Sequence, residues 1–276
     1  MSAPTTMSDA APADALHPYA LTLEYDGSGF SGWQRQPGRR TVEGTLLAAI
    51  AAVTGEEVRL TAAGRTDAGA HAHGQVAGCS LRRGWDPGRL RAALNAVLPA
   101  DVVVVEAAPA PAGFHARLDA VARSYRYVVM SRGERSAVAR QYAWRVRGPL
   151  DLAAMRRVAA SLVGTHDFAA FGRSPRRGGS TTRRVDSVRL RQLALAERRG
   201  IAPQSAVVIE VVADAFLYGM MRSIAGALVA VGLGRMRGEQ LAALVQRPPA
   251  QRPPLPVAPA HGLHQWRVTY PQTVTR

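Results

Sequence analysis

Residues 62–77 read AAGRTDAGAHAHGQVA and place a glycine-rich turn between two stretches of strand character, 57–63 and 74–81. Glycines let the backbone bend sharply, so such a turn reverses the chain and presents side chains from a rigid scaffold. Asp67 lies in this turn and is a candidate nucleophile or base. The alternative is that Asp67 only caps its own turn, as aspartate often does.

Two histidines of the same stretch offer a different chemistry. His71 and His73 are two residues apart, so in an extended segment both side chains point the same way and could bind a metal together with Asp67. No cysteine, glutamate or further histidine cluster follows at ligand spacing. We therefore expect no metal site, and a metal-dependent nuclease is kept as a rival hypothesis.

Outward from the turn, the sequence alternates between strand and helix patterns. Strands are expected at 19–25, 57–63, 74–81, 101–108, 120–130, 184–190, 206–212 and 263–270, and helices at 41–55, 86–97, 150–164 and 216–232. In the helix that Asp86 opens, Leu90, Leu94 and Val97 are expected to point inward. A proline-rich connector, 247–260, precedes the final strand.

This order of elements predicts an α+β fold of two halves that meet near residues 110–120. Residues 1–17 show no secretory or transit pattern and are expected to be a disordered tail. The first subdomain spans 18–112 and carries the turn with Asp67, and the second spans 113–276.

The charge balance favours a polyanionic partner. The chain has 35 basic residues against 20 acidic ones, a formal net charge of +15, and every basic residue is arginine. Guanidinium binds phosphates and bases bidentately and stacks on rings, so nucleic acid is favoured over an anionic membrane. The longest nearly apolar stretch, 224–234, is too short to span a bilayer. The lone Cys79 excludes an internal disulfide and is compatible with a reducing cytoplasm.

Arg222 lies in the middle of the expected apolar helix 216–232. A buried guanidinium needs a carboxylate partner, because leaving it unpaired would cost several kcal/mol. Asp67 is a natural candidate for that partner. The alternative is that Arg222 lies on a narrow exposed strip and reaches solvent.

An aromatic and basic segment, RSYRY at 123–127, places Arg123, Tyr125 and Tyr127 on one side of a strand. Positive charge beside flat rings suits stacking against a base. The two tyrosines are equally typical of a buried core.

The turn, GRTDAGAHAHGQVA, resembles the catalytic loop of the bacterial tRNA pseudouridine synthase A family. Further stretches match the same family in family order: LEYDGSGFSGWQRQ, LNAVLPADV, FHARLDAVARSYRY, VGTHDFAAF, FLYGMMRSIAGALVAVG and APAHGLHQWRVTYP. Together they cover about residues 19–271, which is a far more specific signal than one short motif. The sequence departs from the usual pattern at Ala70, Gly219, Ser223 and the tetrapeptide LHQW.

The resemblance implies a pseudouridine synthase fold: two similar subdomains, each a mostly antiparallel sheet backed by helices, with a central RNA-binding cleft. It implies isomerisation of uridine to pseudouridine at positions 38, 39 and 40 of the tRNA anticodon stem-loop, without metal or organic cofactor. By residue match, Asp67 would be the catalytic aspartate, Arg65 would contact the RNA, Tyr125 would stack on the uracil and Arg222 would pair with Asp67.

Further expectations concern partners and location. A homodimer in the cytoplasm is expected, with no membrane association. Residues in three arginine-containing segments, 113–119, 123–127 and 172–184, are expected to contact RNA, and the first and third segments could equally be solvated loops. These residues are Phe114, His115, Ala116, Arg117, Leu118, Arg123, Arg176 and Arg177. An RNA-binding protein without turnover is the second rival hypothesis.

Overall fold

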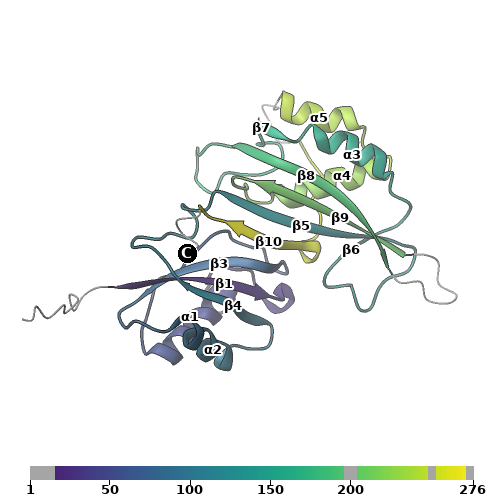
Figure 1. The fold of residues 1–276 in the computed structure, drawn as a ribbon. Coiled ribbons are helices and arrows are strands. Elements are labelled where there is room, and N and C mark those ends of the chain that lie inside the picture. Colours follow the sequence, from purple (N-terminus) through teal and green to yellow (C-terminus); the bar gives the residue numbers. More distant parts are fainter. Residues whose placement is uncertain (1–15, 196–203, 248–252, 272–276) are drawn as a thin grey trace, which may run out of the picture.

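The protein is described by a computed structural model that covers residues 16–195, 204–247 and 253–271 (Figure 1). The strands are β1 (His17–Tyr25), β2 (Thr61–Ala62), β3 (His71–Leu81), β4 (Val102–Pro109), β5 (Ala122–Ser131), β6 (Trp144–Val146), β7 (Gly164–Asp167), β8 (Thr182–Leu195), β9 (Gln204–Ala213) and β10 (Leu263–Thr269), and the helices are α1 (Val42–Thr54), α2 (Pro87–Val97), α3 (Leu152–Ala160), α4 (Met220–Gly232) and α5 (Gly238–Gln246). The expected α+β class is confirmed.

In the described residues the strands form one ten-stranded sheet, in the order β4-β1-β3-β10-β5-β9-β8-β7, with β2 paired to β3 and β6 to β5. Most neighbours are antiparallel, as expected, but β10 runs parallel to β3 and β6 parallel to β5. β10 therefore joins the strands of the two expected subdomains into a continuous sheet. The contact is short, because it pairs His264 with His71 and Gln265 with Ala72.

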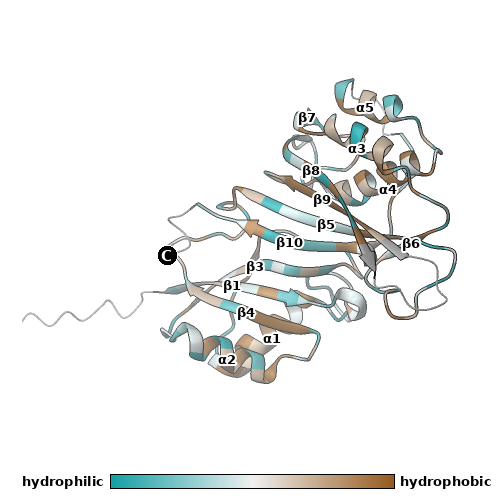
Figure 2. Ribbon diagram, turned by 45° about the vertical axis from the view of Figure 1, so that its right-hand side comes forward, coloured by the Kyte–Doolittle hydropathy of each residue, from teal (hydrophilic) through white to brown (hydrophobic). Residues whose placement is uncertain are grey.

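Two groups of helices pack on this sheet, and each covers its own hydrophobic core. One core joins β1, β3 and β4 to α1 and α2, and the other joins β5, β8 and β9 to α3, α4 and α5. β4 and β9, which are rich in valine, are largely hydrophobic in Figure 2. The boundary between subdomains at 112 and 113 stays a prediction.

Local signals explain several helix ends. The Thr41 hydroxyl accepts from the Gly44 N–H at 3.3 Å, and Gly55 ends α1 in the left-handed region at φ +73°. The Asp86 carboxylate accepts from the Arg89 N–H at 2.8 Å and opens α2. The expectation for Val97 is wrong: its side chain is 51% exposed at the last residue of α2, beyond the reach of the core.

Other expectations need correction because of backbone geometry. The helix expected from 216 begins at Met220, since Gly219 has φ +77° and Tyr218 pairs instead with Arg173 in an isolated antiparallel bridge. The expected helix 150–164 ends at Ala160. The strand expected at 57–63 is reduced to β2.

Elements that the sequence reading missed are β6, β7 and α5. The expected tail also ends earlier, because His17 already belongs to β1. Residues 1–15 and the part of the connector at 248–252 lie outside the described residues. In the part of the chain that the structure describes, no helix is long and apolar enough to cross a membrane.

Candidate active site

The loop between β2 and β3 holds Asp67 in a tight turn. Gly69 has φ +79°, and the Ala70 N–H donates to the Asp67 carbonyl at 3.1 Å. A positive φ at the third residue of a four-residue turn is the geometry of a type II turn, which favours glycine there. The sequence therefore folds locally so that the Asp67 side chain projects from the turn.

Neighbouring residues fix this loop in place. The Tyr25 hydroxyl and the Thr66 hydroxyl share a buried hydrogen bond of 2.7 Å, and the Trp33 N–H donates to the Thr66 carbonyl at 3.1 Å. Gly32, with φ +88°, packs so closely that a Cβ there would lie 2.8 Å from the Thr66 carbonyl oxygen. The Asp67 loop is thus held by β1 and by the segment that precedes α1.

Asp67 forms an ion pair with Arg222 of α4, as the sequence predicts. An Arg222 Nη1–H donates to Asp67 Oδ2 at 2.6 Å, and Arg222 Nε–H donates to the Ala258 carbonyl at 2.7 Å. The Asp67 and Arg222 side chains are 16% and 24% exposed, so Arg222 does not merely reach solvent along an exposed strip. Two contacts to different segments orient the guanidinium, and the guanidinium orients the carboxylate.

The departures at Gly219 and Ser223 do not prevent this ion pair. Gly219 caps the N-terminus of α4 and Ser223 is fully buried within it. Ala70, the third departure, is also buried and packs into the core that α4 covers. Arg222 therefore reaches Asp67 from a helix whose first turn is firmly packed.

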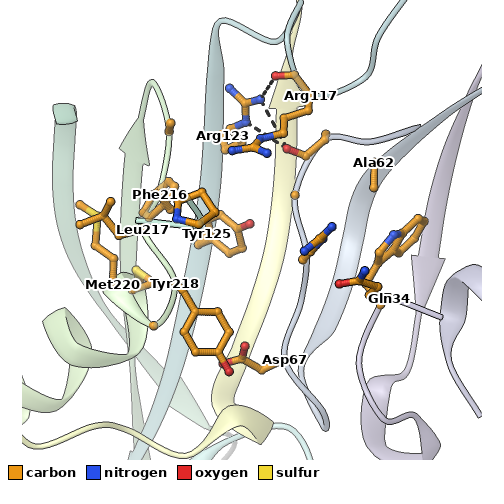
Figure 3. A pocket seen from close by; sticks show the side chains of 18 of the residues that line it. Gln34, Ala62, Asp67, Arg117, Arg123, Tyr125, Phe216, Leu217, Tyr218 and Met220 are labelled. Carbon is orange, nitrogen blue, oxygen red and sulfur yellow. Dashed lines mark hydrogen bonds between the residues drawn. The ribbon is translucent and has the colours of Figure 1, made fainter. Parts of the chain in front are cut away.

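The ion pair faces a cavity of about 710 Å³ that draws its walls from segments far apart in the sequence (Figure 3). The arginines that line it are Arg65, Arg117, Arg123, Arg173, Arg183 and Arg222. Asp67 and Glu43 supply the acidic groups among its described lining residues. Such an excess of guanidinium groups around one oriented carboxylate suits an anionic, phosphate-bearing ligand.

Tyr125 forms part of the cavity wall while most of its ring is buried. The ring contacts Phe216 edge-on, with centroids 4.7 Å apart. The hydroxyl lies against Gly64, where an added Cβ would be 2.9 Å away. Burial raises the pKa of the Tyr125 phenol to about 12. Tyr125 packs into the core and also borders the cavity. The core interpretation is therefore confirmed, and stacking against a base stays a prediction.

Two buried glutamines support the same region, and sequence reasoning missed them. The Gln75 amide donates to the Gly64 carbonyl at 2.6 Å, and the Gln265 amide donates to Gln75 Oε1 at 3.0 Å. The side-chain oxygen of Gln265 has no hydrogen-bond partner among the described residues. Gln265 lies opposite Tyr125 in the pairing of β10 with β5.

Arg123, one of the residues expected to contact RNA, is buried. Burial lowers the pKa of its guanidinium, whose hydrogens are used within the protein. They go to the carbonyl oxygens of Ala63, Arg117, Ala120 and Asp214. Arg123 therefore ties the segment before the Asp67 loop to two other segments.

The remaining residues of the expected RNA-binding set occupy different surroundings. Ala116 is fully buried, and Phe114 packs edge-on against Tyr270. Residues at the cavity are His115 and Arg117, and exposed residues outside its lining are Leu118, Arg176 and Arg177. Arg65 is exposed at the cavity. Direct contact of these residues with RNA stays a prediction.

His71 and His73 do not join Asp67. The Gly27 N–H donates to His71 Nδ1 at 3.1 Å, and His71 Nε2 donates to the Gln141 carbonyl at 2.7 Å. His73 lies 3.3 Å from a ring nitrogen of His264. The described residues contain no group of three histidines, cysteines or carboxylates that could hold a metal, so the arrangement required by the nuclease hypothesis is not formed.

A third histidine completes a row of rings. His264 stacks on His71 and on His73, with centroids 4.8 and 5.4 Å apart, and donates to the Tyr142 carbonyl at 2.9 Å. Burial, followed by the nearby His71 and His73, lowers the pKa of His264 to about 4. Trp266 extends the row, 4.7 Å from the His73 ring.

Comparison with known proteins identifies a family for the chain. The family described as tRNA pseudouridine synthase matches residues 22–119 and 158–271. Relatives named tRNA pseudouridine synthase A include one from Geobacter sp. (strain M21), 39% identical over 91% of this chain and 98% of its own length. Another, from Frankia casuarinae, is 44% identical over 94% of this chain and 91% of its own length. A third, from Methylobacterium radiotolerans, is 40% identical over 89% of this chain and 94% of its own length.

The site thus consists of an oriented carboxylate in a cavity lined by arginines and a tyrosine. The chain belongs to the tRNA pseudouridine synthase family. Its full-length similarity is to the members named tRNA pseudouridine synthase A.

Sequence reasoning missed several cavity residues. Phe216 and Tyr218 fall within the expected helix 216–232, and Arg173 and Arg183 belong to the arginine-containing segment 172–184 that also holds Arg176 and Arg177. For Phe216 and Tyr218, the signal is Gly219, a glycine that directly follows an aromatic residue and directly precedes an apolar stretch. A glycine at that position indicates that the helix begins after it.

Proposed function

We propose that the protein isomerises uridine to pseudouridine at positions 38, 39 and 40 of the tRNA anticodon stem-loop, with Asp67 as the reacting carboxylate. The observation that carries the proposal is the 2.6 Å ion pair between Asp67 and Arg222 inside the arginine-lined cavity. An aspartate that only capped its own turn would not need an arginine from a distant helix.

The reaction requires few groups. The bond between C1′ of the ribose and N1 of uracil breaks, the detached base turns, and C5 bonds to C1′; the proton leaves C5 and N1 gains one, so atoms balance. An ionised Asp67 can attack C1′ or assist formation of a glycal, and the Arg222 guanidinium aims it for either role. A site that excludes water during the reaction keeps the free base from escaping.

The target uridine must leave the stem to reach Asp67. Base flipping costs a few kcal/mol of lost stacking and pairing, which contacts to arginine and rings must offset. Arg65 at the cavity and the Tyr125 ring are the residues we assign to that role. We assign the Tyr125 ring as a packing surface for uracil, and removal of a proton late in the reaction as a second role for its hydroxyl.

The proposed dimer and the proposed cytoplasmic location rest on the family resemblance, and for location also on the lone Cys79. A homodimer would be tested by sedimentation of the full chain with and without tRNA.

The experiment that tests the function measures pseudouridine in unmodified tRNA carrying uridines at positions 38 to 40, with a chelator present. The native protein should convert these uridines and Asp67→Ala should bind the tRNA without converting it. Asp186→Asn is a matched control, since its carboxylate is exposed and pairs with Arg184 outside the cavity. Binding without conversion by the native protein would favour the RNA-binding hypothesis, and cleavage of the tRNA that occurs only without chelator would favour the nuclease hypothesis.

A further inference from the structure

Tyr218 is the exposed aromatic ring of the cavity. Its side chain is 59% exposed, whereas the Tyr125 and Trp33 rings that also line the cavity are buried. Figure 3 shows the Tyr218 ring standing apart from the packed pair of Phe216 and Tyr125, on the side of the cavity where Asp67 lies. The cavity therefore has rings at two depths.

The exposure of Tyr218 is built into a rigid backbone. Tyr218 and Arg173 exchange two backbone hydrogen bonds, of 2.9 and 3.2 Å, in the isolated bridge. Gly172 packs against this segment, where an added Cβ would lie 3.0 Å from the Tyr218 carbonyl oxygen. The next residue, Gly219, turns the chain into α4. The ring is thus held at the cavity by its backbone and is not covered by the protein.

A guanidinium stands beside the ring. The Arg173 Cζ atom lies 5.9 Å from the centroid of the Tyr218 ring, and Arg173 lines the same cavity. A fixed aromatic surface next to a cation matches the chemistry of an RNA base and its phosphate, because bases stack on flat rings and arginine neutralises the backbone. A protein or lipid partner would not need a ring placed beside Asp67.

We propose that Tyr218 stacks on the base that neighbours the target uridine and remains in the stem when the uridine flips. The proposal rests on the proposed function, since flipping of a uridine is what leaves that neighbour without a stacking partner. Tyr218 is then a positioning residue: it stabilises the opened stem, while Tyr125 contacts the flipped base at greater depth. Losing one such stacking contact lowers binding or turnover by about 10- to 100-fold.

The test compares Tyr218→Ala with Tyr218→Phe, which keeps the ring. The tRNA carries 2-aminopurine, a base whose fluorescence is quenched by stacking, on one side or the other of a target uridine. We expect one of the two probes to stay quenched with the native protein and Tyr218→Phe and to brighten with Tyr218→Ala. Conversion by Tyr218→Ala should fall about 10- to 100-fold in kcat/KM and recover in Tyr218→Phe.

Trp266→Ala is the matched control. Trp266 is 36% exposed and has the Arg126 guanidinium 3.6 Å above its ring, but it is not part of the cavity lining. Its loss should leave both probes unchanged. Thermal unfolding of Tyr218→Ala should match that of the native protein, because the removed ring is exposed.

The outcomes separate the two proposals. If Tyr218→Ala equals the native protein in fluorescence and in kcat/KM, the stacking proposal is overturned and the proposed function stands. If the native protein binds tRNA but converts no uridine, the proposed function fails, and equal probe fluorescence with the native protein and Tyr218→Ala would overturn stacking as well.

Discussion

Consecutive residues of β5 and β10 point to opposite faces of the sheet, and the two faces hold their polar groups differently. On one face Tyr125 and Gln265 lie beside the Asp67 loop and its cavity. On the other, Arg126 pairs with Glu210 at 2.6 Å and the stacked rings include His264.

The difference lies in what surrounds each group. The carboxylate of Asp67 is aimed by one arginine and faces a cavity, whereas His71 and His264 use both ring nitrogens within the protein. A polar group whose partners are all internal stabilises the fold, and one that faces a cavity is available for a ligand. Variants of groups that face the cavity should therefore change activity, and variants of groups whose partners are all internal should change stability.

The largest expected effect is on the cavity face. Asp67→Asn keeps the shape of the side chain and removes its charge, so conversion should fall by about 10⁴-fold or more while the fold is kept. Single-turnover conversion of tRNA and the urea midpoint measure the two quantities. If Asp67→Asn retained activity, Asp67 would not be the reacting group.

Arg123 sharpens the comparison, because it borders the cavity but all its identified contacts are to carbonyl oxygens of the protein. Arg123→Met leaves buried carbonyls without donors, and the free energy of unfolding should fall by about 3 kcal/mol. Urea unfolding measures it. Normal stability combined with weaker tRNA binding would instead support the direct RNA contact that the sequence predicts.

Arg222→Lys keeps the positive charge but cannot bond Asp67 and the Ala258 carbonyl at once. Conversion should fall by about 10- to 100-fold, mainly in kcat, because the carboxylate is less well aimed. Steady-state kinetics on tRNA provide the measurement. An unchanged kcat with a raised KM would mean that Arg222 binds RNA rather than orienting Asp67.

On the opposite face, His264 makes stability depend on pH. Its folded-state pKa of about 4 lies below the ordinary value of 6.5, so the unfolded chain binds the proton first. The stability contributed by neutral His264 is complete above pH 6.5 and is lost as pH falls toward 4. The free energy of unfolding should drop across this window, and less so in His264→Gln, whose activity at pH 7 should be near native.

The smallest effect is expected at Gln265. Its amide oxygen is buried without a partner among the described residues, and Gln75 Oε1 also accepts from the Val76 N–H at 3.1 Å. Gln265→Leu should therefore change the free energy of unfolding by less than about 1 kcal/mol. A larger loss by urea unfolding would show that Gln265 secures the Gly64 region more strongly than its one hydrogen bond suggests.

Features that depend on neighbouring residues or on a single buried charge could be predicted from the sequence. A cation in an apolar helix requires an anion, so Arg222 could be paired with Asp67 from the sequence. Caps at Thr41 and Asp86 placed two helices nearly to the residue, because a cap acts on the backbone beside it.

Longer-range features could not be read in this way. The pairing of β10 with β3 joins residues almost two hundred positions apart, and no local pattern specifies it. The same pairing brings His264 between His71 and His73. Tyr218 was missed for a local reason, since apolar periodicity continues through Gly219 while the backbone there is not helical.

The position of β10 also has a consequence for synthesis. It is the last described strand to leave the ribosome, yet it sits between β3 and β5 in the middle of the sheet. Domains begin to fold as the chain emerges. The strands and helices before β10 should therefore fold first as two separate units, one around each hydrophobic core. The wall containing Tyr125 meets the Asp67 loop only when this strand inserts, so a ribosome-bound chain that stops before Leu263 should be unable to modify RNA.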